Sequence, residues 1–440
     1  MKVLMLGWEY PPHINGGLGT ACLGITTALS KIRSIDLTFA LPKVYGDENA
    51  HHMTLVEPKK NKKNKKNKIR KDVISLKFRE RIKKFTFPEI LNPYWTSEEY
   101  EKFLEDYKIK TLNEINKSGF KLLRSCIDFD FKNFIKTNKL GRQVVKYASN
   151  VVDFFSDDDF DIIHAHDWMT VLPAVALSKL TSKPLVLHIH SLEYDRSGVC
   201  NDYFVNLIEK LGTTYAHRII AVSEYTKNVI VREHGVCKEK ISVVYNAMMF
   251  NKINKYELPK ELKKYKIVLF LGRITWQKGP EFFVEASKKV LEKVRNVKFI
   301  VAGDGDLAPM MVKKTIELQV HDHFIFTGFL KKKEVERVFS ISDVFVMPSF
   351  SEPFGIVALE AIYYGSAIVI SKQSGCSEVI RSALKCDYWD SDKLGEHIIY
   401  LLNNNEARKE LIEESKKELA SLSWDKSAKE IYKVYRSVLS

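Results

Sequence analysis

Two glutamates, Glu352 and Glu360, stand eight residues apart in the segment PSFSEPFGIVALEAIYYG, residues 348–365. From residue 355 onward this segment predicts a helix that is apolar on nearly every side and therefore buried. Glu360 falls inside the predicted helix, and a lone buried charge is costly, so we expect a polar group to meet it. Glu352 lies just before the helix, where Pro353 favours a first helical turn.

The start of this predicted helix could bind an anion. The N–H groups of Phe354, Gly355 and Ile356 would have no acceptor within the helix and would form an N-terminal anion site. Eight helical residues span about 12 Å, close to the distance between the two ends of a nucleotide sugar. One acid would then face a hexose, the amides a phosphate and the other acid a ribose. The alternative is that Glu352 only complements the helix dipole while Glu360 pairs with a structural lysine.

Two cations follow a predicted strand in the same half of the chain. The apolar run at 267–271 ends in Gly-Arg, and Lys278 comes five residues after Arg273. Both side chains would lie beyond the carboxyl end of the strand, where parallel sheets bind their ligands. An arginine fork and a lysine point charge together can neutralise a diphosphate. An ordinary surface pair is the alternative interpretation.

Histidines end two apolar runs in the first half of the chain. His164 and His166 lie in the run at 161–168, and His190 comes at the end of the run at 184–193. Two histidines two residues apart could ligate a metal ion, but no third ligand has a fitting spacing. We therefore predict no metal site.

The alternation of apolar strands and helical segments occurs in two series, which predicts an α/β protein of two domains. A chain of 440 residues is also too long for a single core. We place the first domain at residues 1–247, with an insertion at about 51–138, and the second at 248–424. Each domain is expected to be Rossmann-like, with a doubly wound parallel sheet.

The net charge of +14 invites a nucleic-acid partner, but eight lysines and one arginine of it fall in the run KKNKKNKKNKIRK at 59–71. No aromatic residue alternates with these lysines to stack on bases, so we expect a solvated loop and no nucleic-acid partner. No apolar run approaches the roughly 18 residues that would cross a bilayer. The six cysteines are scattered without a Cys-x-x-Cys pair, which favours a reducing cytoplasm.

The sequence Glu-Pro-Phe-Gly-Ile-Val-Ala-Leu-Glu-Ala at 352–361 resembles the paired-glutamate motif of retaining glycosyltransferases with the GT-B fold, which include glycogen and starch synthases. His-Ala-His-Asp-Trp at 164–168 is similar to the equivalent segment of those synthases, and His190 to the histidine of their His-Asn-Leu motif. The resemblance implies two Rossmann-like domains facing across a deep cleft. It also implies that the last helix, at 425–440, crosses back to the first domain.

A glycine-rich turn at the first strand resembles the phosphate-facing loop of glycogen synthases. It contains Gly16 and Gly17, and backbone amides at such a turn can approach a phosphate closely. A dinucleotide fingerprint fails because Cys22 stands where a third glycine is required. The family usually has a lysine just before the pair, whereas this chain has Ile14 and Asn15, so we expect no cationic contact from this loop.

The resemblance implies an enzyme that moves glucose from ADP- or UDP-glucose to the non-reducing end of an α-1,4-glucan with retention, and without a metal or other cofactor. The implied catalytic residues are Glu352, His190, Arg273 and Lys278. Glu9 and Asp167 are placed on the acceptor side. The implied donor-binding residues are Gly16, Gly17, Arg273, Lys278, Phe354, Gly355, Ile356 and Glu360.

Two alternatives remain from the sequence. One is a GT-B enzyme that acts on a lipid, a small sugar or a sugar phosphate. The lysine run has no apolar face, which argues against a membrane acceptor. The other is a non-catalytic protein that binds a nucleotide sugar or a glucan, for which loss of Arg273, Lys278 or Glu352 would be expected, yet all three are present.

Overall fold

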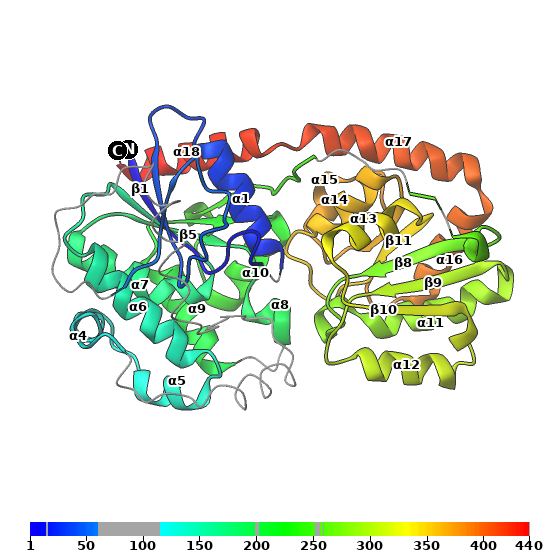
Figure 1. Cartoon of the computed structure of the whole chain (residues 1–440), viewed down its shortest axis with the longest axis horizontal. Coiled ribbons are helices and arrows are strands. Elements are labelled where there is room, and N and C mark those ends of the chain that lie inside the picture. Colours follow the sequence, from blue (N-terminus) through cyan, green and yellow to red (C-terminus); the bar gives the residue numbers. More distant parts are fainter. Residues whose placement is uncertain (15, 60–114, 199–201, 251–255, 258, 440) are drawn as a thin grey trace.

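The computed structural model describes residues 1–14, 16–59, 115–198, 202–250, 256–257 and 259–439. The chain forms two lobes, each built on one parallel β-sheet with helices on both faces (Figure 1). This confirms the predicted pair of doubly wound α/β domains. Most of the lysine-rich run at 59–71 and the middle of the expected insertion lie outside the described residues.

The first lobe contains a seven-stranded sheet in the order β3-β2-β1-β4-β5-β6-β7, and every pair in it is parallel. Helices bury both faces of this sheet, so β4 and β5 are buried along their whole length, including the histidines that they carry. The edge strand β3 falls within the range expected for the insertion and pairs with β2. The strands are β1 (Lys2–Leu6), β2 (Asp36–Ala40), β3 (Thr54–Val56), β4 (Ile162–His166), β5 (Leu185–Ile189), β6 (Arg218–Ala221) and β7 (Ile241–Val243).

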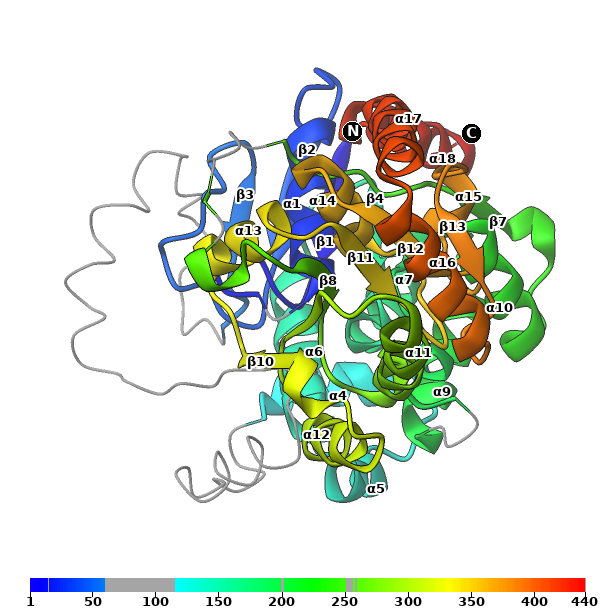
Figure 2. The same cartoon turned by 90° about the vertical axis from the view of Figure 1, so that its right-hand side faces the viewer.

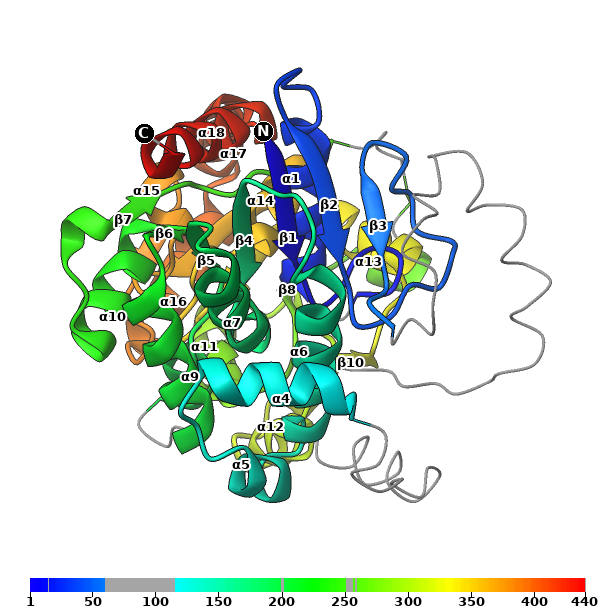
Figure 3. The same ribbon diagram turned by 90° about the vertical axis from the view of Figure 1, so that its left-hand side faces the viewer.

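The helices of the first lobe cover the two faces of this sheet (Figure 3). Helices α6 and α7 pack together and against α4. The helices are α1 (Gly17–Leu29), α4 (Lys117–Cys126), α5 (Phe131–Thr137), α6 (Gly141–Phe155), α7 (Val171–Thr181), α8 (Glu193–Ser197), α9 (Tyr203–Tyr215) and α10 (Glu224–His234).

The second lobe contains a six-stranded parallel sheet in the order β10-β9-β8-β11-β12-β13. The strand order reverses at β8, which lies between β9 and β11. In open α/β sheets, ligands bind beyond the carboxyl ends of the strands at such a reversal. The strands are β8 (Lys266–Leu271), β9 (Val297–Ala302), β10 (Phe324–Gly328), β11 (Val344–Met347), β12 (Ala367–Ser371) and β13 (Leu384–Cys386).

Helices lie on both faces of the second sheet (Figure 2), and two separate apolar cores flank it. Helices α11 and α16 supply one of them, and α13 and α14 supply the other. The helices of this lobe are α11 (Pro280–Lys293), α12 (Ala308–Glu317), α13 (Lys332–Ser340), α14 (Ile356–Tyr364), α15 (Cys376–Val379) and α16 (Ser391–Asn403).

The chain returns to the first lobe at its end. Helix α17 (Asn405–Ser421) lies on the second lobe, and α18 (Trp424–Leu439) packs against α1 of the first (Figure 1). Trp424, Ile431 and Tyr435 of α18 are buried in the core of the first lobe. Across the described ranges, no helix combines the length and the apolar character that a membrane span requires.

Candidate functional site

The turn that carries Glu352 meets the loop that carries Lys278. Nζ of Lys278 donates a hydrogen bond to Oε2 of Glu352, and the hydroxyl of Ser349 lies 3.5 Å from the same oxygen. The two charged side chains are only 17% and 10% exposed. The expected convergence of a cation on this acid is therefore present at the carboxyl ends of β8 and β11.

Arg273 reaches the same turn through Gln277. Nη2 of Arg273 donates to Oε1 of Gln277 at 3.3 Å, and Nε2 of Gln277 donates to the carbonyl oxygen of Ser351 at 2.9 Å. Gly279 permits this close packing, because a Cβ there would lie 2.2 Å from the carbonyl oxygen of Pro348 and its φ is +60°. The structure thus brings Arg273 and Lys278 to the residues around Glu352.

Helix α14 begins directly after this turn. It starts at Ile356, one residue later than predicted, and Gly355 is its N-cap with φ of 99°. A side chain at Gly355 would be strained by this φ and would crowd Met347 and Cys376. Phe354 is buried beneath the turn. The first N–H groups of α14 have no acceptor inside the helix and lie next to Glu352.

Glu360 lies within α14, one turn before its end. Burial raises the pKa of its carboxyl to about 7, and the charge of Lys332 at the start of α13 opposes that rise. Lys332 is therefore a charged neighbour of the kind that the alternative interpretation of Glu360 requires. The ribose contact remains a prediction.

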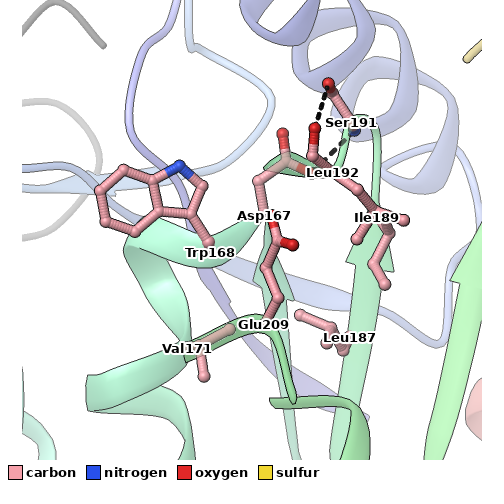
Figure 4. A pocket seen from close by; sticks show the side chains of 8 residues that line it. All are labelled: Asp167, Trp168, Val171, Leu187, Ile189, Ser191, Leu192 and Glu209. Carbon is pink, nitrogen blue, oxygen red and sulfur yellow. Dashed lines mark hydrogen bonds between the residues drawn. The ribbon is translucent and has the colours of Figure 1, made fainter. Parts of the chain in front are cut away.

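On the first lobe, Asp167 organises the loop that carries His190. It follows β4 with φ of 56°, and its Oδ1 accepts the N–H groups of His190 at 2.7 Å and Ser191 at 3.3 Å. Burial raises the pKa of Asp167 to about 7, although these two hydrogen bonds oppose the rise. Figure 4 shows Asp167 in a small pocket that Ile189, Ser191 and other side chains line. Asp167 thus holds the loop after β5 in place.

His190 is a neutral hydrogen-bonding group. Its ring is buried, and Nε2 lies 3.0 Å from Nδ1 of His166. Burial lowers the pKa of His190 to about 3, so the imidazole carries no charge near pH 7. This state suits the hydrogen-bonding role that the sequence predicts for it.

A third histidine joins the pair on β4, and here the sequence reasoning was wrong. His166 pairs in register with His188 of β5, and one ring nitrogen from each of His164, His166 and His188 lies within 4.8 Å of the other two. The rings are stacked, with interplanar angles of 23° between His164 and His166 and 14° between His164 and His188. Lone pairs lie in the ring planes, so stacked rings direct them side by side and not toward one point. Absence of a metal stays a prediction.

The glycine loop before α1 is held by Glu9. Helix α1 begins at Gly17, Gly16 is its extended N-cap, and Oε1 of Glu9 accepts the N–H of Gly19 at 3.0 Å. A carboxylate at a helix N-terminus interacts favourably with the helix dipole. Any phosphate bound by Gly16 and Gly17 would share this helix start with the charge of Glu9. Their phosphate contact remains a prediction.

Sequence reasoning missed the residues that join the two lobes beside Glu352. Ser351 donates its hydroxyl hydrogen to Oδ1 of Asp195 at 2.5 Å, and the hydroxyl of Ser223 donates to the carbonyl oxygen of Pro353 at 2.6 Å. The carboxylate of Glu378 accepts the N–H of Tyr225 at 2.6 Å at the start of α10. Glu378 lies in a Gly-x-x-Glu segment that resembles the family, but no local pattern predicted that Ser351 would meet Asp195 or that Ser223 would meet Pro353.

Two family profiles match the chain. Residues 124–248 match Glycosyltransferase Family 4, and residues 253–418 match Glycosyl transferases group 1. The chain is 26% identical to an uncharacterized glycosyltransferase of Methanocaldococcus jannaschii, with 99% of this chain and 98% of that protein aligned. It is 24% identical to glycogen synthase of Mycobacterium tuberculosis, over 86% of this chain and 80% of the synthase.

Solved structures agree on the fold. Anabaena HepE in complex with UDP and glucose has a TM-score of 0.62 at 17% identity, covering 99% of this chain and all 100% of HepE. Sucrose-phosphate synthase from Thermosynechococcus elongatus has a TM-score of 0.67 at 16% identity, covering 99% of this chain and 98% of the synthase. Together with the two parallel sheets, these likenesses confirm the predicted GT-B fold.

Proposed function

We propose, from the match of two glycosyltransferase profiles to the chain, that it transfers glucose from ADP- or UDP-glucose to the non-reducing end of an α-1,4-glucan with retention. The glycogen synthase relative, aligned over 86% of this chain, supports the choice of substrate class. The convergence of Lys278, Arg273 and the start of α14 around Glu352 is the observation that carries the proposal.

Departure of the nucleoside diphosphate develops negative charge, and this cluster is suited to stabilise it. Lys278 is a mobile point charge, and Arg273 supplies a second cation within reach of the same turn. The N–H groups at the start of α14 add fixed dipoles. Binding of a donor would replace the hydrogen bond between Lys278 and Glu352 with contacts to phosphate and sugar.

The sugar develops positive charge in the transition state, and Glu352 and His190 would hold the sugar in place. Glu352 would accept hydrogen bonds from hexose hydroxyls, and neutral His190 would add a hydrogen bond from the facing lobe. Holding the hexose between the two lobes limits its freedom before transfer. Asp167 already accepts two backbone N–H groups through one oxygen, which makes it a poor candidate for a covalent nucleophile. We therefore assign transfer on one face of the sugar, without a glycosyl-enzyme intermediate.

A donor and acceptor screen tests the proposal. ADP-glucose, UDP-glucose and other nucleotide sugars are each incubated with glycogen, maltodextrin, small sugars, sugar phosphates and lipid acceptors, with and without EDTA. We expect glucose to enter glycogen or maltodextrin at a rate that EDTA does not change, and proton NMR of the product to show the α-anomer. Transfer only to a lipid, a small sugar or a sugar phosphate would overturn the assigned acceptor.

A site variant separates catalysis from binding alone. Glu352→Gln keeps the size of the side chain and removes its charge. We expect the variant to retain nucleotide binding in calorimetry while glucose incorporation is lost. A wild-type protein that binds the nucleotide sugar but transfers to no acceptor would support the non-catalytic alternative.

A further inference from the structure

One carboxylate contacts both loops that carry the proposed catalytic side chains. Asp195, in α8 of the first lobe, accepts the N–H of Leu192 through Oδ2 at 2.7 Å. Its other oxygen, Oδ1, accepts the hydroxyl hydrogen of Ser351 at 2.5 Å. Leu192 lies two residues after His190, and Ser351 immediately precedes Glu352. The side chain therefore touches the chain next to both residues, although they belong to different lobes.

Hydrogen bonds fix both the hydroxyl group and the carbonyl oxygen of Ser351. Its side chain is buried, its hydroxyl lies 2.8 Å from the hydroxyl of Tyr225, and its carbonyl oxygen accepts Nε2 of Gln277. A serine hydroxyl has one hydrogen, so donation to Asp195 requires Tyr225 to donate to Ser351. The direction of this short chain of hydrogen bonds is thus set, and it ends on Asp195.

We propose that Asp195 is a positioning residue for glucosyl transfer, which couples the His190 loop of the first lobe to the Glu352 turn of the second. The proposal rests on the proposed function. Each catalytic loop is tied to the same carboxylate, so the separation of His190 and Glu352 depends on both hydrogen bonds. Removal of either one breaks the hydrogen-bonded path through Asp195 between the two loops, although neither His190 nor Glu352 has been changed.

The surroundings of Asp195 make its charge sensitive to pH. Burial raises the pKa of its carboxyl to about 6, and the hydrogen bonds from Ser351 and Leu192 and the charge of Arg196 oppose this rise. Glu209 of α9 adds to it. On the side of α10, burial raises the pKa of Tyr225 to about 12, so this hydroxyl stays a neutral donor. Below about pH 6 the carboxyl gains a proton and loses part of its acceptor capacity.

Two other contacts keep the lobes together without Asp195. Ser223 donates to the carbonyl oxygen of Pro353, and Glu378 accepts the N–H groups of Glu224 and Tyr225 at 2.9 and 2.6 Å. Loss of the Asp195 contact therefore leaves a joined pair of lobes. A variant at Asp195 therefore tests how His190 and Glu352 are positioned while the two lobes stay joined.

The experiment compares Asp195→Asn, Ser351→Ala and the double variant with Asp202→Asn as a control. Asp202 belongs to the same lobe; its side chain caps α9 by accepting the N–H groups of Phe204 and Val205, and it also accepts Nδ2 of Asn138 at 2.9 Å. We expect each single variant to lower kcat by about 10- to 100-fold with donor KM changed less than about 3-fold, and the control to match wild type. The double variant should be no slower than the slower single variant, because both remove one interaction.

Two further readouts separate positioning from a general structural effect. The fall of wild-type kcat below about pH 6 should become shallower in Asp195→Asn, in which Asp167 and Glu360 still titrate. Hydrogen exchange should accelerate in both segments 190–192 and 350–353 in each single variant, with the thermal midpoint of unfolding within a few degrees of wild type.

Unchanged kcat, additive effects in the double variant, or faster exchange in only one segment would overturn the proposal. Absence of any transfer by wild type would refute the proposed function, while the exchange result would still test the coupling.

Discussion

The ammonium group of Lys278 donates a hydrogen bond to Glu352, and this pair joins the loop after β8 to the turn before α14. Both side chains are largely buried, so neither charge is well solvated without the other. The pair places an ammonium group and a carboxylate next to the free N–H groups at the start of α14. A bound diphosphate would contact Lys278, and a bound hexose would contact Glu352.

Removal of either partner should therefore slow transfer. We expect Glu352→Ala and Lys278→Ala each to lower turnover at least ~100-fold, which corresponds to about 2.7 kcal/mol of barrier. Steady-state rates with the donor found in the screen measure the effect. Lys372→Ala is the matched control, because Lys372 is an exposed cation of the same lobe paired with Asp387 at 2.9 Å. Near-normal rates in either site variant would contradict the assigned roles.

The N-cap of α14 offers a second prediction with a built-in control. Gly355→Ala places a Cβ 3.0 Å from Met347, 3.1 Å from Cys376 and 3.2 Å from Glu352 at a positive φ. Gly365→Ala, at the other end of the helix, meets a similar φ of +95° but has nothing within 4 Å. We expect both variants to lose about 1–2 kcal/mol of stability from backbone strain. Only Gly355→Ala should also weaken nucleotide binding, as measured by calorimetry.

Burial of the histidines on β4 and β5 predicts a loss of stability in acid. Burial lowers the pKa of His164 and His190 to about 3 and that of His188 well below its usual range, whereas an unfolded histidine titrates near pH 6.5. Between these values the unfolded chain binds more protons than the folded chain. The free energy of unfolding therefore falls as pH falls from about 6.5, by about 1.4 kcal/mol per pH unit for each histidine.

His188→Leu tests this acid dependence. Both ring nitrogens of His188 are buried without a hydrogen-bond partner in the described part of the chain, so an apolar side chain should be tolerated at neutral pH. Urea unfolding at pH 7.5, 6.5 and 5.5 should show a shallower fall in stability for this variant than for wild type. An exposed-site control, His321→Gln, should keep the wild-type slope. Equal slopes for all three proteins would contradict the prediction.

The buried hydroxyl of Tyr435 should stabilise the contact between α18 and the first sheet. It lies 2.5 Å from Nδ1 of His164 in the core. Tyr435→Phe leaves that nitrogen without its partner, and we expect a loss of about 1–3 kcal/mol in the free energy of unfolding. Tyr432→Phe is the control, since its hydroxyl contacts Ser34 at the exposed surface. Equal midpoints in chemical unfolding would show that the buried hydrogen bond contributes nothing.

Local pattern was enough to predict two parallel-sheet domains and the convergence of Arg273 and Lys278 on the turn at Glu352. The apolar runs at 343–347 and 267–271 form β11 and β8, and their carboxyl ends bring Arg273 and Lys278 to Glu352. The carboxyl ends of parallel strands meet at one edge of a sheet, so residues that directly follow two such strands can be predicted from the sequence to lie close together. The helix was predicted to start one residue early because the sequence does not show that Gly355 has a positive φ, which excludes it from the helix and makes it the N-cap.

Contacts between distant segments could not be predicted in the same way. Asp195 and Ser351 are 156 residues apart, and their meeting depends on how the two lobes sit against each other. The third histidine of the cluster, His188, was missed because it arrives through strand register and not through spacing within one motif. The hydrogen bond from the N–H of Gly19 to Glu9 depends in the same way on how the loop between these two residues folds.

Helix α18 has one further consequence. Its residues Ile431 and Tyr435 fill the core of a lobe whose strand β1 begins at residue 2, so this core combines segments from far apart in the sequence. The first lobe can therefore reach its finished core only after α18 has been synthesised, which follows both sheets in the chain. A chain cut before Trp424 would contain every strand of both sheets and still lack the apolar residues with which α18 completes the first core.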